Sequence, residues 1–392
     1  MIKAVDLFAG CGGLSLGFQN AGVDVRAAFE FWDVAAAVYE NNFSHPVFQL
    51  DLSNTENAVK VITPFHPDVI IGGPPCQDFS HAGKRVEAER AGLTGSFANI
   101  IKEVLPHYFV MENVDRAEKS NAYAYARATF KEAGYGLTEI VLDASYCGVP
   151  QKRKRFFCIG VLGGKDDCVR PFIEKKISDK ETTLRDYFGD SLGFEYYYRH
   201  PRNYSRRAVF SIDEPAPTMR GVNRPVPKGY PGHPNDACPV GDGVRALTTR
   251  ERALIQTFPD SFVWVGNKTD MEQMIGNAVP VKLAEFVATA LTDYIQSINQ
   301  VEYAPGFYNW LISEKCYSER VAKDILSRNK RAERLIPSHG VVDDYYMFTL
   351  EQQPKFQEMS NTVRSQIKKA VQLLAEYYSW ENCTQLEMAE VG

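Results

Sequence analysis

The chain has 392 residues, 44% of them hydrophobic and 24% charged, which suits two domains, or one large domain with an appendage. Its net charge of −5 does not imply a nucleic-acid partner, so any nucleic-acid site must be a local basic patch. No apolar run nears the ~20 residues of a membrane span, no signal pattern begins the chain, and no CxxC pair occurs, so we expect a cytoplasmic protein without a membrane or metal partner.

Short apolar segments alternate with helical patterns over the first part of the chain. The expected strands are Lys3–Phe8, Val25–Phe29, Asp68–Ile71, Tyr108–Met111 and Arg155–Leu162. The expected helices are Leu14–Ala21, Asp33–Asn42 and Ala122–Ala133. This alternation predicts an α/β fold with a doubly wound, mostly parallel sheet, and we assign residues 1–163 to its first part.

The rest of the chain predicts three further regions. Residues 164–244 are rich in Tyr, Arg, Pro and Gly and have weak periodicity, which predicts an irregular second lobe. Residues 245–300 return to helical patterns at Leu247–Phe258, capped by Thr248 or Thr249, and at Val281–Ile298, and close the α/β domain. Residues 301–392 form a helical C-terminal extension, with amphipathic helices expected at Glu319–Leu335 and Asn361–Tyr378.

The glycine-rich stretch DLFAGCGGLSLGF places Gly10 and Gly12 between the first predicted strand and helix. Glycines there let the backbone approach a ligand, and a helix N-terminus favours negative charge, although a simple tight turn is the alternative. Glu30 follows the predicted strand Val25–Phe29 and favours a cofactor loop, because a carboxylate at a strand end often meets ribose hydroxyls. Asp51, which follows a further candidate strand, also favours such a loop. Trp32 can stack on a purine or serve as a core aromatic.

A second motif, GGPPCQDFS, follows the predicted strand DVII and presents Cys76 at the carboxyl end of the sheet, where ligands bind. A thiolate there is a candidate nucleophile. The alternative, a buried structural cysteine, requires neither the rigid Pro-Pro before it nor the polar QDFS after it. Glu112 directly follows the strand YFVM on the same edge, and a partly buried glutamate can donate a proton. Alone, Glu112 would be interpreted as an ordinary strand-end acid.

A third motif, QKRKR, precedes the strand FFCIGV. On an extended segment, alternation directs Gln151, Arg153 and Arg155 to one side and the two lysines to the other. Arginine on the inner side suits planar hydrogen bonding to a base carbonyl or a carboxylate. A basic run alone is usually a solvated face.

The combination of these motifs resembles the cytosine-5 DNA methyltransferase family, of the bacterial restriction-modification type. FAGCGG, GGPPCQDFS, ENV and QKRKR occur in the order and at the spacing of that family, followed by RALTTRERALIQTFP and GNAVP. The resemblance covers positions 1–300. It implies a Rossmann-like methyltransferase fold in which residues 164–244 form the target-recognition lobe.

The resemblance also implies a cofactor, S-adenosylmethionine. Glu30 would take the ribose, Trp32 would pack on the adenine, and Asp51 would read the adenine amino group. Phe31 stands between Glu30 and Trp32, whereas family members often place the acid directly before the stacking residue. The full set of implied cofactor residues is Phe8, Gly10, Gly12, Glu30, Trp32, Asp51, Pro74, Leu93 and Asn277.

The implied reaction is methylation of cytosine C5 in a specific double-stranded DNA sequence. The Cys76 thiolate would add to C6, Glu112 would hold N3, and Arg155, supported by Arg153, would contact the base carbonyl and the site carboxylate. The target base must leave the stack, and the polar stretch Ser80–Ser96 could form a lid over it, or a surface loop.

Sequence recognition would fall to the lobe of residues 164–244, through phosphate and base-edge contacts. The candidate DNA-contact residues are Ser80, Gln151, Arg199, Arg202, Arg206, Arg207, Thr218 and Arg220. The basic helix face within Phe307–Leu335 could add DNA contacts, or cap the catalytic lobe. We expect a monomer, with a possible cognate restriction endonuclease acting on the same site.

Three alternatives remain at this point. The same chemistry could act on a tRNA cytosine, although the tRNA branch usually lacks a large variable lobe. A non-catalytic binding module is disfavoured because Cys76, Glu112 and the arginines are intact. A dinucleotide oxidoreductase would give the GGPPCQ block no role.

Overall fold

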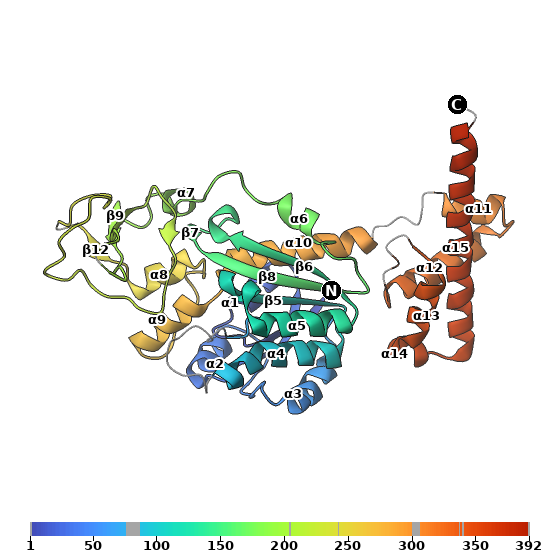
Figure 1. The fold of residues 1–392 in the computed structure, drawn as a ribbon, viewed down its shortest axis with the longest axis horizontal. Coiled ribbons are helices and arrows are strands. Elements are labelled where there is room, and N and C mark those ends of the chain that lie inside the picture. Colours follow the sequence, from blue (N-terminus) through green and yellow to red (C-terminus); the bar gives the residue numbers. More distant parts are fainter. Residues whose placement is uncertain are drawn as a thin grey trace. The chain divides into compact units, whose positions relative to one another are not determined.

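The computed structural model describes residues 2–75, 87–203, 205–241, 243–299, 306–336, 338 and 341–390, without the side chains of 87–91, 298–299 and 382–390 (Figure 1). The chain divides into two compact units, Met1–Thr292 and Asp293–Gly392. Cys76 and Ser80, two residues singled out by the sequence, lie outside the described residues.

The first unit is built on a seven-stranded sheet. In spatial order its strands are β3 (Val47–Phe48), β2 (Asp24–Phe29), β1 (Lys3–Leu7), β4 (Val69–Gly72), β5 (Tyr108–Val114), β8 (Lys154–Leu162) and β6 (Tyr135–Asp143). All pairings are parallel except those of β8, which runs antiparallel to β5 and β6. The prediction of an α/β fold with a mostly parallel sheet is therefore confirmed.

Helices cover both faces of this sheet (Figure 1). One face is covered by α3 (Thr55–Ile62), α4 (Glu87–Val104) and α5 (Asn121–Glu132), whose apolar residues share a buried cluster with Val5, Ile70 and Phe109. The other face carries α1 (Gly13–Asn20) and α10 (Val281–Asn299). A side chain on Gly17 would overlap the backbone of α10, so these two helices meet without intervening atoms.

Three further helices complete the α/β part of the first unit. They are α2 (Asp33–Glu40), α8 (Thr249–Ile255) and α9 (Lys268–Asn277). Thr248 caps α8 through a capping box with Glu251, as predicted. The stretch Lys268–Ser297 is the one described segment that is long and apolar enough to cross a membrane by composition, and 67% of its most apolar window is buried in the fold.

The lobe between β8 and α8 is mostly irregular, as predicted, and has its own small core. Its elements are α6 (Arg170–Glu174), α7 (Leu184–Phe188), β9 (Tyr196–Tyr198), β10 (Val209–Ser211), β11 (Ala216–Pro217) and β12 (Arg245–Ala246). Strand β9 pairs with β10 and β12, and β11 pairs with β7 (Gln151–Lys152). Leu184, Tyr197 and Phe210 form the centre of the lobe.

The second unit is helical. Its helices are α11 (Phe307–Ser313), α12 (Glu319–Glu333), α13 (Asp344–Gln352), α14 (Pro354–Gln357) and α15 (Asn361–Glu390). Aromatic residues of α11 pack against Ile325 of α12 and Tyr377 of α15. The two amphipathic helices expected in this region are present.

One expectation about local structure is wrong, and one long strand was not predicted. Residues 87–104 form α4, so the second half of the loop expected at Ser80–Ser96 is helical. The sequence did not predict β6, whose first four residues are all buried and whose later residues, apart from Leu142, are partly exposed.

Candidate active site

A cavity of about 600 Å³ opens at the carboxyl ends of the parallel strands. Its walls come from the segments that follow β1, β2 and β4 and from the end of β5. Open α/β sheets bind ligands at this edge. Eight of the nine predicted cofactor residues line the cavity, namely Phe8, Gly10, Glu30, Trp32, Asp51, Pro74, Leu93 and Asn277.

The glycine loop after β1 is shaped by left-handed backbone conformations. Phe8, Gly10 and Gly12 have φ angles of 58°, 56° and 96°. No atom lies within 4 Å of a Cβ built on Gly10, so that glycine faces open space. Gly12 is not among the lining residues; a Cβ there would overlap the ring of Phe43, so it shapes the turn before α1.

Glu30 connects the glycine loop to the turn before α2. One carboxylate oxygen accepts a hydrogen bond from the backbone N–H of Gly10 at 2.7 Å, and the other accepts from the N–H of Trp32 at 2.7 Å. This bridge spans Phe31, the residue that departs from the family pattern and whose side chain is 73% exposed. Glu30 is thereby held against the cavity wall in a fixed orientation.

Trp32 and Asp51 both line the cavity. Trp32 packs against the cluster that contains Val38 and Met274 and also lines the cavity, so the two interpretations of its role are compatible. Asp51 is exposed, and its carboxylate accepts from the backbone N–H of Ser53 at 2.9 Å. An indole face can stack on a purine ring, and a carboxylate can accept a hydrogen bond from the exocyclic amine of that purine.

The GNAVP segment at the end of α9 closes the cavity from far along the chain. Gly276, Asn277 and Val279 line it. A Cβ on Gly13 would overlap the carbonyl oxygen of Val279, so the segment contacts the start of α1 backbone to backbone. The glycine in the loop permits this approach.

Glu112 and Arg155 form an ion pair at the other end of the cavity. The Arg155 Nε atom lies 2.8 Å from a Glu112 carboxylate oxygen, and both side chains are largely buried. Burial raises the pKa of Glu112, while the positive charges of Arg155 and Arg153 oppose this rise. A carboxyl with a raised pKa next to a fixed cation is suited to sharing a proton with a ligand.

Asn113 is a site residue that the sequence analysis did not single out, although the ENV motif contains it. Its amide Nδ2 donates to the carbonyl of Pro74 at 3.1 Å, and both Asn113 and Pro75 line the cavity. This bond anchors the start of the Pro-Pro loop, the last described residues before Cys76, to the end of β5.

Two predicted functional residues are engaged within the protein. Arg153 is 1% exposed and donates to the carbonyls of Met219, Gly276 and Ala278 at 2.8–3.0 Å. Arg153 therefore joins the lobe to the GNAVP segment. It does not line the cavity, and its position indicates a structural role in place of direct contact with a substrate.

Gln151 is fully buried. Its amide donates to the Gln256 side chain at 2.6 Å, and its oxygen accepts from the N–H of Met219 at 2.8 Å. The expectation of a DNA contact for Gln151 is inconsistent with this burial. The predicted alternation holds, because Lys152 and Lys154 are exposed.

The arginines of the lobe divide into two groups. Arg199 donates to the carbonyl of Thr218 at 2.6 Å, Arg220 donates to the carbonyl of His200 at 2.5 Å, and Arg207 pairs with Glu214. Burial lowers the pKa values of Arg199 and Arg220, and their neighbouring cations lower them further. Thr218 itself donates to the carbonyl of Lys152 at 2.7 Å.

Arg202 and Arg206 form the second group, because both are exposed. The positive charges of Arg202 and Arg206 both lower the pKa of the Arg220 guanidinium. A group of cations that repel one another on a surface is a suitable place for an anionic partner.

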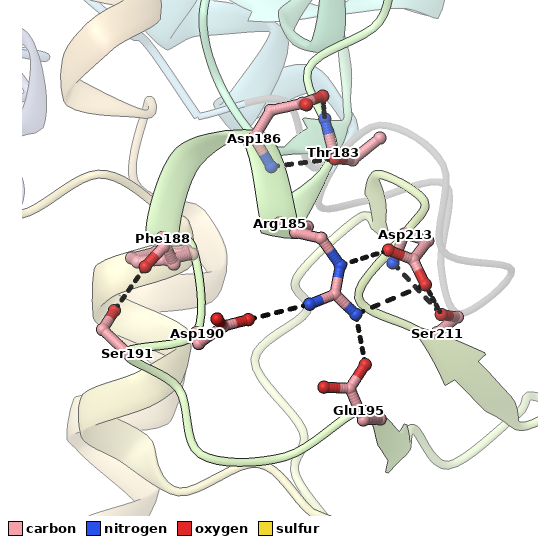
Figure 2. Close-up of polar contacts among 9 residues, drawn as sticks. All are labelled: Thr183, Arg185, Asp186, Phe188, Asp190, Ser191, Glu195, Ser211 and Asp213. Carbon is pink, nitrogen blue, oxygen red and sulfur yellow. Dashed lines mark hydrogen bonds and ion pairs between the residues drawn. The ribbon is translucent and has the colours of Figure 1, made fainter.

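Arg185 holds the outer part of the lobe together (Figure 2). Its guanidinium binds Asp190 at 2.9 Å and also pairs with Glu195 and Asp213, so one side chain connects α7 to the segments before β9 and after β10. The capping box of Thr183 and Asp186 fixes the start of α7 beside it.

Comparison with known proteins decides the family. The profile of the C-5 cytosine-specific DNA methylases matches residues 2–293. The chain is 57% identical over 297 residues to the type II methyltransferase M.HindV of Haemophilus influenzae, covering 75% of this chain and 97% of that protein. It is 51% identical over 310 residues to M.HgiDI of Herpetosiphon aurantiacus, covering 78% and 100%.

The chain belongs to the C-5 cytosine-specific DNA methylase family. The crystal structure of S. pombe Dnmt2 methyltransferase shares the fold of this methylase, with a TM-score of 0.54, 20% identity, and coverage of 75% of this chain and 99% of that one. The family profile ends at residue 293, where the C-terminal unit of the methylase begins.

Glu272 is a second residue that the sequence analysis did not single out. It is 3% exposed, pairs with the equally buried Arg252, and accepts hydrogen bonds from Thr249 at 2.8 Å and Asn223 at 3.0 Å. These contacts lock the lobe of the methylase to α8 and α9. Among the described residues, no group of three or more His, Cys, Asp or Glu side chains is arranged to hold a metal ion.

Proposed function

We propose that this protein transfers a methyl group from S-adenosylmethionine to cytosine C5 within a specific sequence of double-stranded DNA. The observation that carries the proposal is one cavity with two ends. Trp32 and the glycine loop lie at one end, and the buried Glu112–Arg155 pair lies at the other. Such a cavity can hold a nucleoside cofactor and a heteroaromatic base side by side.

The residues present fit the cofactor. Gly10 leaves open space for a ligand, Trp32 offers an aromatic face, and Asp51 offers a carboxylate. Glu30 would accept hydrogen bonds from the ribose hydroxyls, because its two backbone hydrogen bonds leave lone pairs free on both carboxylate oxygens. Pro74, Leu93 and Asn277 would close the pocket, and Phe8 and Gly12 would shape its loop. When bound, S-adenosylmethionine supplies an electrophilic methyl group.

The chemistry assigned to the chain begins with Cys76. Its thiolate would form a bond to C6 of the cytosine, while Glu112 would hold N3 as the ring gains electron density. C5 would then take the methyl group as the bond between that methyl and the cofactor sulfur breaks, leaving the cofactor as a thioether. A base would remove the C5 proton, and the bond between Cys76 and C6 would break. Arg155 would orient Glu112 and contact the base carbonyl.

The target base must leave the duplex, because C6 is out of reach inside the stack. We assign recognition to the lobe of residues 164–244, with exposed Arg202 and Arg206 as the foremost contacts. Arg199, Arg207, Thr218 and Arg220 would support these contacts through the hydrogen bonds and ion pairs described above. Residues 1–163 and 245–300 would form the catalytic domain.

A cytoplasmic monomer paired with a restriction endonuclease for the same sequence is the setting we infer. The relatives named above are type II methyltransferases, which supports the DNA substrate over the tRNA alternative. Bisulfite sequencing of plasmid DNA from expressing cells would identify the modified cytosine.

The decisive experiment traps the covalent intermediate. A fluorine at C5 cannot leave as a cation, so DNA with 5-fluorocytosine at the target should form a denaturation-resistant complex in the presence of cofactor. Cys76→Ala should bind DNA but form no complex and transfer no methyl group. A complex that persists in Cys76→Ala would identify another nucleophile, and trapping on tRNA alone would establish the alternative substrate.

A further inference from the structure

Helix α12 of the C-terminal unit carries a continuous cationic face. Five of its flanking and internal residues are exposed cations, namely Arg320, Lys323, Lys330, Arg331 and Arg334. At about 100° per residue they fall within a sector roughly 100° wide. At ~1.5 Å per residue, the face is roughly 21 Å long. We refer to these five residues as the α12 cationic face.

The α12 cationic face lies opposite the packing face of the same helix. Ala322, Ile325, Asn329 and Ala332 are buried, and the first two pack in the cluster with Trp310 and Tyr377. The burial of one side fixes the rotation of α12 about its axis, so the cations point away from the core of the unit. Packing within the C-terminal unit therefore does not require these charges.

Most of these cations have no acidic partner. Within the described part of the chain, no ion pair involves Arg320, Lys330, Arg331 or Arg334; Lys323 lies 3.6 Å from Glu319. Two exposed acids, Glu319 and Asp324, lie at the two edges of the face. Acidic residues outnumber basic residues over 293–392, so the cations are gathered on one face of an otherwise acidic unit.

A face of this kind is complementary to a regular polyanion. One DNA strand carries a phosphate every ~3.4 Å along the helix axis, so the length of the α12 cationic face matches the backbone of roughly six base pairs. Long, flexible cations on a rigid helix suit phosphate contacts, which position a protein without reading sequence.

We propose that the α12 cationic face binds the DNA phosphate backbone independently of sequence. DNA is favoured over other polyanions because the same chain carries a DNA methylase unit, which the family profile covers and the C-terminal unit follows. Joining two DNA-binding surfaces in one chain raises their combined affinity through effective concentration. The inference rests on the DNA substrate of the family and not on the chemistry of Cys76.

The test uses the full chain with Arg320, Lys330, Arg331 and Arg334 all changed to Gln. DNA binding is measured between about 50 and 200 mM salt for a duplex that contains the target sequence and for a duplex that lacks it. Because each phosphate contact contributes about 0.9 to the slope of log K against log salt, the slope should flatten by roughly 3 to 4. The variant should lose affinity for both duplexes by the same factor, and it should modify the same cytosine as the parent protein.

A matched pair of double variants separates local from bulk charge. Lys330→Gln/Arg331→Gln should flatten the slope by about 2, whereas Lys355→Gln/Lys369→Gln, with the same change in charge on exposed positions of α14 and α15, should not. Equal effects of the two pairs, or no effect of either, would overturn the proposal. Binding to vesicles of anionic phospholipid that depends on the face, with unchanged DNA binding, would overturn it in favour of a membrane surface.

The variants are expected to remain folded, because each changed side chain is exposed on the face opposite the core. Thermal unfolding within a few degrees of the parent checks this. The 5-fluorocytosine complex should still form in every variant, so failure of the adduct assay and failure of the salt assay are distinguishable.

Discussion

The pKa of Glu112 is raised by burial even though a guanidinium lies 2.8 Å away. Glu112→Gln keeps the shape of the side chain and an acceptor for Arg155 but removes the exchangeable proton. We therefore expect kcat to fall by ~10²–10⁴ while both ligands still bind, the usual range for general acid–base help. Single-turnover methylation measures this, and a rate within tenfold of the parent would contradict the role.

Trp32 provides a second test at the cofactor end. Replacing it with Ala should weaken S-adenosylmethionine binding by about 1–3 kcal/mol, the range for losing a stack of a base on an aromatic ring. Because Trp32 also packs against Val38 and Met274, the unfolding temperature must be measured beside the calorimetry. Unchanged affinity in a folded variant would show that the adenine lies elsewhere.

Asp6, beneath the glycine loop, predicts a pH dependence of stability. Burial raises the pKa of Asp6 to about 7, and the negative charge of Glu30 adds to this rise. The hydrogen bond that Ser15 donates to Asp6 at 2.7 Å acts in the opposite direction. The folded protein therefore keeps a proton that the unfolded chain releases, and stability falls as pH rises from about 4 to about 7.

Asp6→Asn should remove this dependence, because the amide does not titrate. Between about pH 4 and about pH 7, the free energy of unfolding of the parent should fall by up to ~4 kcal/mol more than that of Asp6→Asn, at 1.36 kcal/mol per pKa unit. Urea unfolding at about pH 4 and pH 8 measures the difference. Parallel pH profiles for the two proteins would mean that the carboxyl is ionised when folded.

At the scale of elements, the lobe of residues 164–244 and the cavity share a wall. A Cβ on Gly276 of α9 would overlap the backbone of Arg220 and Gly221, and Arg153 holds the carbonyl of Gly276. Gly276→Ala should therefore move the GNAVP segment, weaken cofactor binding at least tenfold and cost ~1–3 kcal/mol of stability.

Gly92→Ala is the matched control for this substitution. Gly92 is also helical, next to a cavity residue, and nothing lies within 4 Å of a Cβ there. Alanine should stabilise α4 by up to about 1 kcal/mol and leave cofactor affinity unchanged. Similar losses in both variants would show that helical glycine, and not the contact of the two segments, sets the affinity.

The sequence predicted those elements whose pattern is local. Alternating strands and helices, the capped helix at Thr248 and the inner side of QKRKR follow from periodicity, and all are present. What Arg153 and Gln151 contact was not predictable, because their partners in the lobe and in GNAVP are far away in the chain. Strand β6 was missed because it lacks the alternation of a half-buried strand: its first four residues are all buried, and Glu139, near its middle, binds Arg127.

The same limit applies to the arginines of the lobe. Their number and spacing suggest DNA contacts for all of them, but Arg207 pairs with Glu214 and Arg199 binds a backbone carbonyl. A cation that binds DNA and a cation that holds a loop look alike in a sequence. Among the five candidate arginines, only burial and partners separate Arg202 and Arg206 from Arg199, Arg207 and Arg220.

For the whole molecule, removing residues 301–392 is the corresponding prediction. The methylase unit ends at Thr292, and relatives matched over nearly their full length lack the extension, so the shortened protein should fold and modify the same cytosine. Its DNA affinity should fall, and its salt dependence should flatten as in the quadruple variant. Loss of folding would mean that the extension is a structural cap.

The position of GNAVP also sets an order in time. The wall formed by Gly276 and Val279 is the last part of the cavity to be synthesised, and about a hundred residues follow it. At ~5–20 residues per second, the ribosome needs at least roughly 5–20 s to add those residues. The cavity can therefore close while the C-terminal helices are still being made, and under the proposed function a nascent chain can be competent for methylation before it is released.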